Sequence, residues 1–356
     1  MTAKLRGIIV FSMCFALEIP GIQASPLNSG RQTLTDSLQR TVVLPPRSER
    51  ILSLQPEMTR IIVALGGGDR LVGVDYFVKE HDRLFSIIFP RASQLPAVSN
   101  TPEDMNFEMV MRLDPDVVFV SPTERQMVDV LQKKMQKPVI ALSSMGKFEN
   151  LLREIDLAGK VLGREERAAE LIAYFDSKVG SIRGERSRAV PARKPRVYLA
   201  FWASLTRTPV FYEPVNAAGG VNCAENLLPA YLGTLGTVIQ VEQIIIWNPD
   251  IILVHGNYSP GERAVTVESV LGDRRLASVS AVRNRRVYYT FGFWYWWDPA
   301  QVLVETLYLA RIFSPETAGR VDIEAEGNAI YEKFYGIQNG FTSVCRIIGC
   351  GTWHEQ

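Results

Sequence analysis

One pattern of apolar and polar residues occurs twice in this chain, over residues 108–120 and again over residues 242–254. Each copy starts with Glu, continues through a short stretch with helical spacing, reaches Pro-Asp and ends in four consecutive apolar residues. This spacing predicts a short helix that opens at the Glu, a turn at Pro-Asp and a strand that is buried on both faces of a parallel sheet. The repeat therefore predicts two lobes of one design.

Strands and helices are predicted to alternate through the rest of both lobes. In the first lobe we expect strands over residues 51–54, 71–74, 117–120 and 138–142, with helices over 56–65 and 123–136. In the second lobe we expect strands over residues 196–201, 251–254 and 287–290, with a closing helix over 300–313. Such alternation is typical of α/β lobes, each with a mainly parallel sheet that has helices on both faces.

A helical segment over residues 148–190 joins the two lobes. Its second half has apolar residues at three- and four-residue spacings among charged ones: Ala168, Leu171, Ile172, Phe175, Val179 and Ile182. This pattern predicts one long helix over residues 164–188 with a single buried stripe, about 35 Å long at a rise of 1.5 Å per residue. A stiff helix of this kind would hold the lobes at a nearly fixed separation.

The first 24 residues have the features of an export signal. A basic start is followed by an apolar run over residues 7–17 and by a small residue, Ala24, where signal peptidase would cut. The run is too short for a permanent membrane span. The predicted organisation is a signal peptide 1–24, an N-terminal extension 25–40, an N-terminal α/β lobe 41–147, a linking helical segment 148–190, a C-terminal α/β lobe 191–313, and a C-terminal helix with a Cys-containing tail 314–356.

Composition and net charge exclude few classes of function. The chain has 356 residues, of which 47% are hydrophobic, and a net charge of +1, which offers no general attraction to nucleic acid or to an anionic membrane. In an oxidising compartment Cys345 and Cys350 can close a short loop as a disulfide, which leaves Cys223 as a small buried residue. These cysteines have no second Cys or His pair at the spacing of a zinc site.

Aromatic residues are concentrated where predicted strands end. Open α/β sheets place their ligand clefts at the carboxyl ends of the strands. The predicted ligand-binding residues near these ends are Tyr76, Phe77, Trp202, Arg207, Tyr212, Tyr258, Phe293, Trp294 and Trp296. Trp and Tyr supply flat contact surface and polar tips, so this set favours haem, cobalamin or an aryl siderophore over a bare oxyanion. The alternative is that about half of these side chains belong to the core.

Two histidines raise the question of a metal. His255 follows a predicted strand directly and His81 lies in the loop after another, so each could reach the cleft from its own lobe and complete the coordination of a chelated metal. A structural role is the alternative for both. Arg60 and Arg207 could instead pair with the negative charge of a ferric chelate, or lie on the surface.

The order of several short motifs resembles the periplasmic substrate-binding proteins of ABC importers for iron-siderophore complexes, haem and cobalamin. Besides the two Glu/Pro-Asp phrases and the linking helix, the motifs are Thr-Asp-Ser-Leu-Gln-Arg-Thr-Val at 35–42, Arg-Ile-Leu-Ser-Leu at 50–54, Leu-Gly at 65–66 before the strand at 71–74, and Tyr-Glu-Lys-Phe-Tyr-Gly at 331–336. The resemblance covers residues 35–336 and implies two α/β lobes joined by one long helix, with the ligand in the cleft between them. It departs from the family pattern at Arg60, where Glu is usual.

The resemblance also implies a function and partners. Glu108 and Glu242 match the acidic residues that dock onto arginines of the permease; the alternative is that each is only a helix N-terminal acid. The chain would then be a monomeric periplasmic component of an importer, without an intrinsic cofactor, that delivers an iron chelate, haem or cobalamin to a permease dimer with its ATPase. A nickel chelate, molybdate or tungstate as ligand, or a metal chaperone or sensor without a transporter, remain alternatives.

Catalysis is not expected. The chain has no Gly-x-Ser-x-Gly elbow, no phosphate-binding Gly-x-x-x-x-Gly-Lys-Ser/Thr loop and no His-Glu-x-x-His motif. With three histidines, acid-base chemistry would depend on carboxylates, and these show no distinctive pairing in the sequence.

Overall fold

A computed structural model describes residues 32–101, 104–122, 125–142, 145–188, 193–230, 235–293, 297–318 and 321–353. The predicted signal peptide and residues 25–31 of the extension lie outside these ranges. Residues from Gln32 onward form one compact unit. Within the described ranges, no helix is both long enough and apolar enough to cross a membrane.

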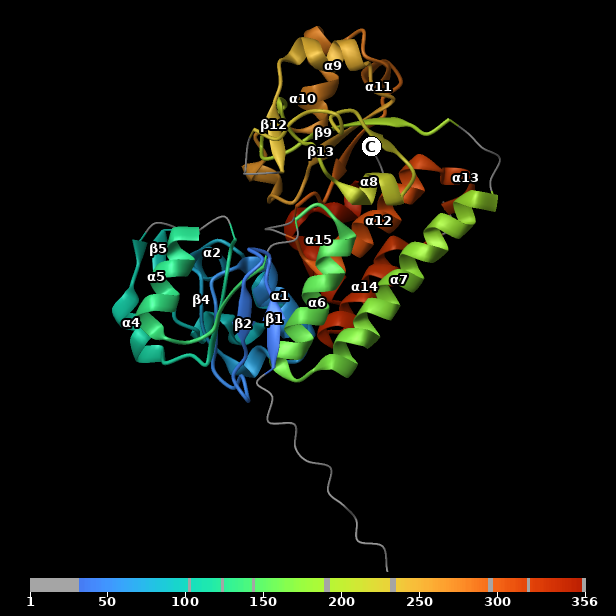
Figure 1. The fold of residues 1–356 in the computed structure, drawn as a ribbon. Coiled ribbons are helices and arrows are strands. Elements are labelled where there is room, and N and C mark those ends of the chain that lie inside the picture. Colours follow the sequence, from blue (N-terminus) through green and yellow to red (C-terminus); the bar gives the residue numbers. More distant parts are fainter. Residues whose placement is uncertain are drawn as a thin grey trace, which may run out of the picture. The chain divides into compact units, whose positions relative to one another are not determined.

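The N-terminal lobe is built on a four-stranded parallel sheet with the strand order β4-β3-β7-β8 (Figure 1). Its strands are β3 (Ile51–Ser53), β4 (Leu71–Val74), β7 (Val117–Val120) and β8 (Val139–Ala141). Its helices are α1 (Pro56–Ala64), α2 (Tyr76–Glu80), α3 (Phe85–Ile88), α4 (Phe107–Leu113) and α5 (Arg125–Met135). The predicted strands and helices of this lobe are confirmed to within two residues at each described end.

The C-terminal lobe has a second four-stranded parallel sheet, with the order β11-β9-β13-β14. Its strands are β9 (Arg196–Ala200), β11 (Val221–Asn222), β13 (Ile251–His255) and β14 (Val287–Thr290). Its helices are α8 (Glu213–Ala217), α9 (Val241–Trp247), α10 (Val267–Leu271), α11 (Ser280–Arg283) and α12 (Pro299–Phe313). The predicted strands of this lobe and its closing helix are likewise confirmed, and α13 (Pro315–Ala318), α14 (Ile323–Tyr335) and α15 (Gly340–Ile348) follow.

Within the described residues, three antiparallel strand pairs accompany the parallel sheets: β1 (Thr33–Thr35) with β2 (Thr41–Val43), β5 (Ser99–Thr101) with β6 (Asp104–Met105), and β10 (Arg207–Pro209) with β12 (Gly236–Val238). The first begins inside the segment predicted as an extension. Its turn is held by Asp36, whose carboxylate accepts the backbone N–H groups of Leu38 and Arg40, each at 3.0 Å, and pairs with the Arg40 guanidinium. The N–H of Ser37 donates to the carbonyl of Ala141, and the N–H of Ala141 donates to the Asp36 carboxylate, so the turn is attached to the end of β8.

The repeated phrase folds in the same way in both lobes. Helices α4 and α9 each end at a residue in the left-handed conformation, Asp114 (φ 39°) and Asn248 (φ 45°), where Asp and Asn are tolerated better than most residues. The Asp of each Pro-Asp then accepts backbone N–H groups from the neighbouring strand: Asp116 from Arg50 at 2.9 Å and Asp250 from Arg196 at 2.8 Å. Pro-Asp therefore fastens each central strand to its neighbour.

The linking segment is a pair of helices, α6 (Phe148–Leu162) and α7 (Glu165–Arg188). Gly163, at φ 62°, ends α6 in the left-handed conformation, for which glycine carries no steric cost. The helices pack so closely that a Cβ on Gly159 would lie 2.6 Å from Cβ of Ala168. The predicted stripe of α7 is buried at Ala168, Leu171, Phe175, Val179 and Ile182, and Ile172 is half-buried.

The hydrophobic core does not divide at the boundary between the lobes. One continuous cluster runs from Leu34 to Trp353 and includes residues of both sheets, α1, α6, α7, α12 and α14. A second, smaller cluster lies on the other face of the N-terminal sheet and contains Leu52, Val118 and Val120. Alternate residues of β7 thus enter different clusters, as the two-residue period of a strand requires.

We expect Phe175→Ala to lower the free energy of unfolding by about 3–5 kcal/mol, the usual cost of truncating a fully buried Phe. Phe175 is 1% exposed and its ring meets that of Phe148 edge-on at 5.0 Å, so the cavity would open where the linking helices join the core. Urea unfolding measures the change. Glu166→Ala, on the exposed side of α7, is the control; a similar small effect of both changes would contradict the role of the α7 stripe.

Candidate functional site

The carboxyl ends of the C-terminal strands carry a cluster of aromatic rings that we call the aromatic wall. Its members are Phe201, Trp202, Tyr212, His255, Tyr258, Phe293 and Trp297. The first two follow β9, His255 ends β13, and Phe293 follows β14. Because parallel strands end at the same edge of a sheet, three segments far apart in sequence meet here.

The rings of the aromatic wall differ in how far they are buried. Trp202 lies parallel to Phe293, with an interplanar angle of 6° and ring centroids 5.7 Å apart, and Tyr212 meets Phe293 edge-on at 5.0 Å. Phe293 and Tyr212 are buried, whereas Trp202 and Tyr258 are half-buried. The predicted residues Trp202, Tyr212, Tyr258 and Phe293 thus come together, but only Trp202 and Tyr258 expose part of their surface.

His255 is the polar centre of the aromatic wall. Its ring stacks on Phe201 at 4.6 Å, and its Nδ1 accepts the backbone N–H of Trp202 at 3.2 Å. With Nδ1 as acceptor, the proton of the neutral ring lies on Nε2. That nitrogen is buried, faces the backbone of Gly292, and has no hydrogen-bond partner of normal geometry within the described residues.

Burial is the main cause that lowers the pKa of His255 to about 3, although the nearby carbonyl groups of Phe291 and Phe293 oppose it. The ring is therefore neutral at physiological pH. Since one nitrogen accepts a hydrogen bond and the other carries the proton, the geometry supports a structural role for His255 rather than the predicted metal ligation. The hydrogen bond also helps to hold Trp202 at φ 51°, a conformation that few residues except glycine adopt.

A buried carboxyl, Glu305, lies beneath the aromatic wall. One of its oxygens accepts the backbone N–H of Phe291 at 2.9 Å and the other is hydrogen-bonded to the hydroxyl of Thr290. Burial raises its pKa to about 7, since these hydrogen bonds compensate only in part for the loss of water. Glu305 was not among the predicted site residues; its signal in the sequence is a lone acid within the apolar helix α12.

The N-terminal lobe has its own smaller group of polar and aromatic residues at the carboxyl ends of β3 and β4. Asp75 caps α2 by accepting the N–H of Val78 at 3.1 Å, and it is followed by Tyr76 and Phe77, both half-buried. Exposed His81 contacts the rings of Tyr76 and Phe77 at 5.7 and 5.6 Å.

Two carboxyl groups at this edge are buried with incomplete hydrogen bonding. Burial raises the pKa values of Asp75 and of Glu57, at the start of α1, to about 7 each. Both Glu57 oxygens and one Asp75 oxygen find no hydrogen-bond partner within the described residues. Such groups are protonated in a large fraction of molecules near neutral pH.

Arg60 is not available to a ligand. It is 1% exposed and pairs with the carboxylate of Asp82, while its Nε lies 3.3 Å from Oδ2 of Asp298. The expectation that it could meet a ferric chelate is therefore wrong, because both sides of the guanidinium are occupied. Arg207 is half-buried on β10, where its carbonyl oxygen accepts the N–H of Phe201 at 2.9 Å.

Several predicted residues lie elsewhere or outside the described ranges. Trp294 and Trp296 belong to the segment 294–296, which the structure does not describe. His81 and His255 belong to separate ring clusters, and within the described residues no group of three or more His, Cys, Asp or Glu side chains could hold a metal ion.

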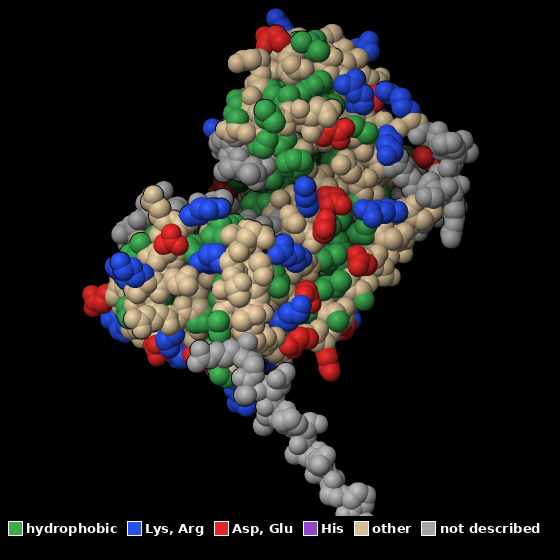
Figure 2. All heavy atoms as spheres, viewed as in Figure 1, with side chains coloured by type: hydrophobic (Ala, Val, Ile, Leu, Met, Phe, Trp, Pro, Cys, Tyr) green, Lys and Arg blue, Asp and Glu red, His purple; other side chains and the backbone are tan. Residues whose placement is uncertain are grey.

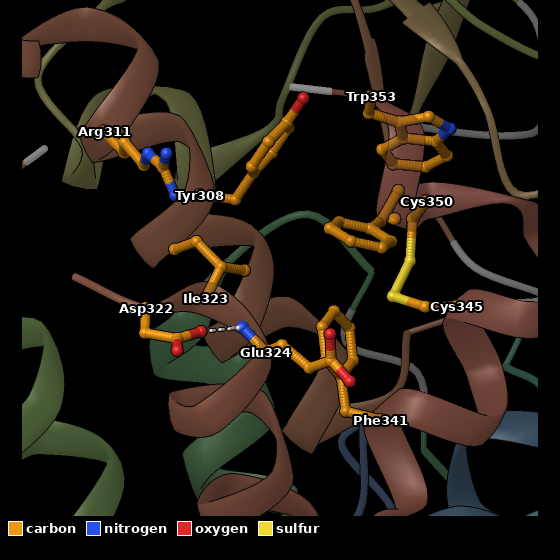
Figure 3. A pocket seen from close by; sticks show the side chains of 11 residues that line it. Tyr308, Arg311, Asp322, Ile323, Glu324, Phe341, Cys345, Cys350 and Trp353 are labelled. Carbon is orange, nitrogen blue, oxygen red and sulfur yellow. Dashed lines mark hydrogen bonds between the residues drawn. A yellow bond between two sulfur atoms is a disulfide. The ribbon is translucent and has the colours of Figure 1, made fainter. Parts of the chain in front are cut away.

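A pocket of about 160 Å³ lies beside the disulfide of the tail, lined by Tyr308, Phe341, Trp353 and others (Figure 3).

Glu108 and Glu242 occupy equivalent places on α4 and α9. Each is the second residue of its helix and exposed. Exposed apolar side chains lie one turn further along: Met111 (51% exposed) on α4 and Ile246 (73% exposed) on α9. Figure 2 shows apolar surface together with basic side chains around α9 at the top of the C-terminal lobe.

The family assignment follows from comparison with known proteins. A family model described as periplasmic binding protein matches residues 51–291, which run from β3 of the first lobe to the end of β14 in the second. The chain belongs to the periplasmic binding protein family. The match spans both sheets and the linking helices, and it includes all of the aromatic wall except Phe293 and Trp297.

Relatives of this periplasmic binding protein bind different solutes. The molybdate-binding protein MolA of Haemophilus influenzae is 25% identical in an alignment 367 residues long. The alignment covers 93% of this chain and 97% of MolA. A cobalamin-binding protein of Halobacterium salinarum is 26% identical over 264 residues, 72% of this chain and 66% of that protein. The solved structure of MolA bound to molybdate has a TM-score of 0.71 and 22% identity, covering 86% of this chain and 98% of MolA.

These comparisons confirm the predicted family and fold. The chain is a substrate-binding protein of the ABC-transporter type, with the two-lobed α/β fold of its structural neighbours and an extracytoplasmic location. The family consists of solute-binding proteins, in agreement with the absence of catalytic motifs from the sequence.

We expect Glu305→Gln to flatten the pH dependence of stability between about pH 4.5 and 7. The folded pKa of Glu305, about 7, lies above its ordinary value of 4.5, so in this window the folded protein keeps a proton that the unfolded chain has lost. Rising pH therefore favours unfolding, by at most about 1.4 kcal/mol per pH unit for one group.

Urea unfolding at several pH values measures this slope in the wild type and in Glu305→Gln. The amide cannot ionise, so the variant should lose less stability than the wild type as pH rises. Glu166→Gln, at an exposed carboxyl, is the control. Parallel slopes in all three proteins would contradict a proton bound to Glu305 in the folded state.

Proposed function

We propose that this protein captures a large, ring-bearing metal complex, such as a ferric siderophore, haem or cobalamin, and delivers it to an ABC permease. The aromatic wall is the observation that carries this proposal. Trp202 and Tyr258 are half-buried at the carboxyl edge of the sheet, and they contact the buried rings of Phe293 and His255. Rigid aromatic surface of this kind suits a flat or ring-bearing ligand better than a small hydrated anion.

The opposite lobe supports the same class of ligand. Tyr76 and Phe77 are half-buried at the carboxyl end of β4, the equivalent edge of the N-terminal sheet. A ligand between the two lobes would then meet aromatic side chains from both. The cobalamin-binding protein of Halobacterium salinarum matches this chain over 72% of its length.

A molybdate-type oxyanion is the second candidate. It is supported by MolA, which matches over nearly the full length of both chains. Arg207 is the predicted residue that suits such an anion, because a guanidinium can donate two parallel hydrogen bonds. The aromatic wall contributes nothing specific to a small anion, and we therefore place this candidate second.

Titration of tryptophan fluorescence distinguishes the two candidates. We expect cobalamin, haem or a ferric catecholate siderophore to quench the emission strongly, and we expect Trp202→Phe to lose a measurable part of the quenching, since this indole would lie against the ligand. Sodium molybdate should leave the emission nearly unchanged. Saturable binding of molybdate alone, confirmed by calorimetry, would replace the first candidate with the second.

We further propose that Glu108 and Glu242 dock onto basic residues of the permease. Equivalent helices in the two lobes carry them at the same position, so the chain offers a similar site twice, as a permease made of two like subunits would require. The exposed Met111 and Ile246 beside them supply apolar contact area next to the charge. Helix N-terminal acids without a partner would need no such repetition.

Reversal of both charges, Glu108→Lys with Glu242→Lys, should abolish uptake of the ligand by cells. Ligand affinity should remain nearly intact, because a rim charge acts mainly on association with its partner. Each single change should cause a partial loss of uptake. The stability cost should stay below about 1 kcal/mol per site, the range for a helix-terminal acid.

Uptake of labelled ligand and calorimetric affinity are measured side by side on these variants. Glu166→Lys, at an exposed position on α7, is the matched charge reversal and should leave uptake unchanged. Normal uptake by the double variant would show that the two residues are only helix acids.

A further inference from the structure

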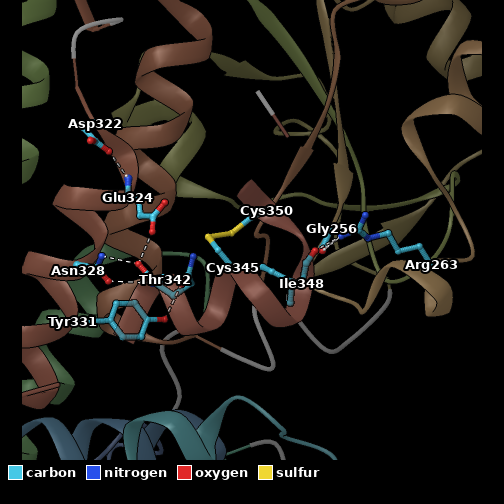
Figure 4. Close-up of a disulfide and its surroundings, with 11 residues drawn as sticks. Gly256, Arg263, Asp322, Glu324, Asn328, Tyr331, Thr342, Cys345, Ile348 and Cys350 are labelled. Atoms are coloured by element: carbon cyan, nitrogen blue, oxygen red, sulfur yellow. Dashed lines mark hydrogen bonds between the residues drawn. A yellow bond between two sulfur atoms is a disulfide. The ribbon is translucent and has the colours of Figure 1, made fainter. Parts of the chain in front are cut away.

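The last residues that the structure describes pack against the strands that carry the aromatic wall. After α15 the chain turns at Gly349, forms one 3-10 turn over Cys350–Thr352 and places Trp353 in the core, where it is 3% exposed. Figure 4 shows this tail beside the loop that contains Gly256 and Arg263. The family match ends at residue 291, before this tail begins.

Two features set the direction in which the tail leaves α15. The disulfide between Cys345 and Cys350 joins the helix to the turn that follows it, with Cα atoms 4.7 Å apart. Gly349 lies between these residues at φ 67°, and a Cβ there would be strained and would lie 3.2 Å from Cγ of Pro260. The disulfide and the glycine together direct the chain toward the sheet.

Trp353 fills a space that is shaped for it at the ends of β13 and β14. A Cβ on Gly256, the residue after β13, would lie 2.7 Å from Cζ2 of the indole, so only glycine allows this approach. On the β14 side the indole meets Phe291 at 4.8 Å. Arg263 closes the contact, since it donates hydrogen bonds to the carbonyl groups of Gly256, at 3.1 Å, and of Ile348 in α15.

The same two strand ends hold His255 in place. Gly256 follows His255 directly, and Gly292 follows Phe291; a Cβ on Gly292 would lie 2.3 Å from Nε2 of His255. The two strand ends are joined by the hydrogen bond from the N–H of Gly256 to the carbonyl of Thr290, at 2.8 Å. A continuous series of contacts thus leads from Trp353 through the strand ends to His255, whose Nδ1 holds the backbone N–H of Trp202.

We propose that Trp353, held by the Cys345–Cys350 disulfide, is a positioning residue for the aromatic wall. It does not belong to the wall. Its indole keeps the ends of β13 and β14 in the one arrangement that fits His255 between Phe201 and Gly292, and His255 in turn keeps Trp202 in its left-handed conformation. The consequence for ligand capture rests on the proposed function, whereas the consequence for Trp202 does not.

Hydrogen exchange of the Trp202 backbone N–H tests the proposal without any ligand. In full-length Trp353→Ala we expect this N–H to exchange about tenfold faster or more, because the bond to His255 would open locally. The N–H groups in the middle of β9 and β13 should keep their wild-type rates under the same conditions. Trp353→Phe should restore most of the protection, since a second aromatic ring can refill much of the space.

Phe334→Ala is the matched control, because Phe334 is equally buried, at 1% exposure, but contacts Tyr174 and Tyr335 rather than the wall. It should lower the unfolding midpoint without selective exchange at Trp202. If Trp353→Ala lowered the midpoint and left the Trp202 N–H protected, the tail would be a stabilising element only and the proposal would fail. If Trp353→Ala did not fold, Cys345→Ser with Cys350→Ser would decide: unchanged protection of Trp202 overturns the proposal.

A second arm measures affinity, with cobalamin, haem, a ferric catecholate siderophore and molybdate as the probes. Whichever probe binds the wild type should bind Trp353→Ala at least about fivefold more weakly, with Trp353→Phe close to the wild type and Phe334→Ala unchanged. Equal affinity of Trp353→Ala and wild type would overturn the role in ligand capture. If none of these probes bound the wild type, the proposed function would be in question while the exchange result at Trp202 still decided the positioning role.

Discussion

The arrangement of the two lobes depends on one buried guanidinium. Arg60 in α1 pairs with Asp82 from the N-terminal lobe and with Asp298, which caps the helix that closes the C-terminal lobe. A charge this deeply buried is tolerated only with its partners in place, because removal of one partner leaves an uncompensated ion in a medium of low dielectric constant. Arg60 therefore ties the position of α12 in the C-terminal lobe to that of α1 in the N-terminal lobe.

Other groups reinforce this junction. The hydroxyl of Tyr335 donates to Asp298 at 2.9 Å, and Arg167 of α7 donates to the carbonyl groups of Ala64 in α1 and of Lys333 in α14. The long helix α7 thus touches elements of both lobes along its buried side. Together with the core that continues across the lobes, these bonds give a physical reason for expecting little hinge motion.

The repeated phrase made most of the fold predictable from the sequence. Four consecutive apolar residues after each Pro-Asp are typical of a strand that is buried on both faces of a sheet. The apolar stripe of α7 follows from the 3.6-residue period of a helix. Both signals are local. The partners of Arg60 could not be predicted in the same way. Asp82 lies 22 residues further along the chain and Asp298 caps the closing helix of the other lobe, and an Arg within a helix is usually exposed.

The candidate site was predictable in its location but not in its geometry. Strand ends identified Trp202, Tyr212, His255 and Phe293, yet the sequence could not show that three of these rings are buried or that His255 accepts a hydrogen bond from Trp202. These properties depend on contacts between segments that are distant in sequence, such as Gly292 against the imidazole of His255.

The left-handed conformation of Trp202 and Ala203 connects the fold to the site. Non-glycine residues at φ 51° and 53° are held there by their surroundings, at a cost of about 1–3 kcal/mol each. The surroundings here are the hydrogen bond to His255, at the end of β13, and the stack on Phe293, which follows β14. A wall assembled from three strands in this way presents one defined surface. Because this surface is formed before binding, binding does not carry the entropic cost of ordering the wall. The stability of the sheet thereby contributes to the affinity of the site.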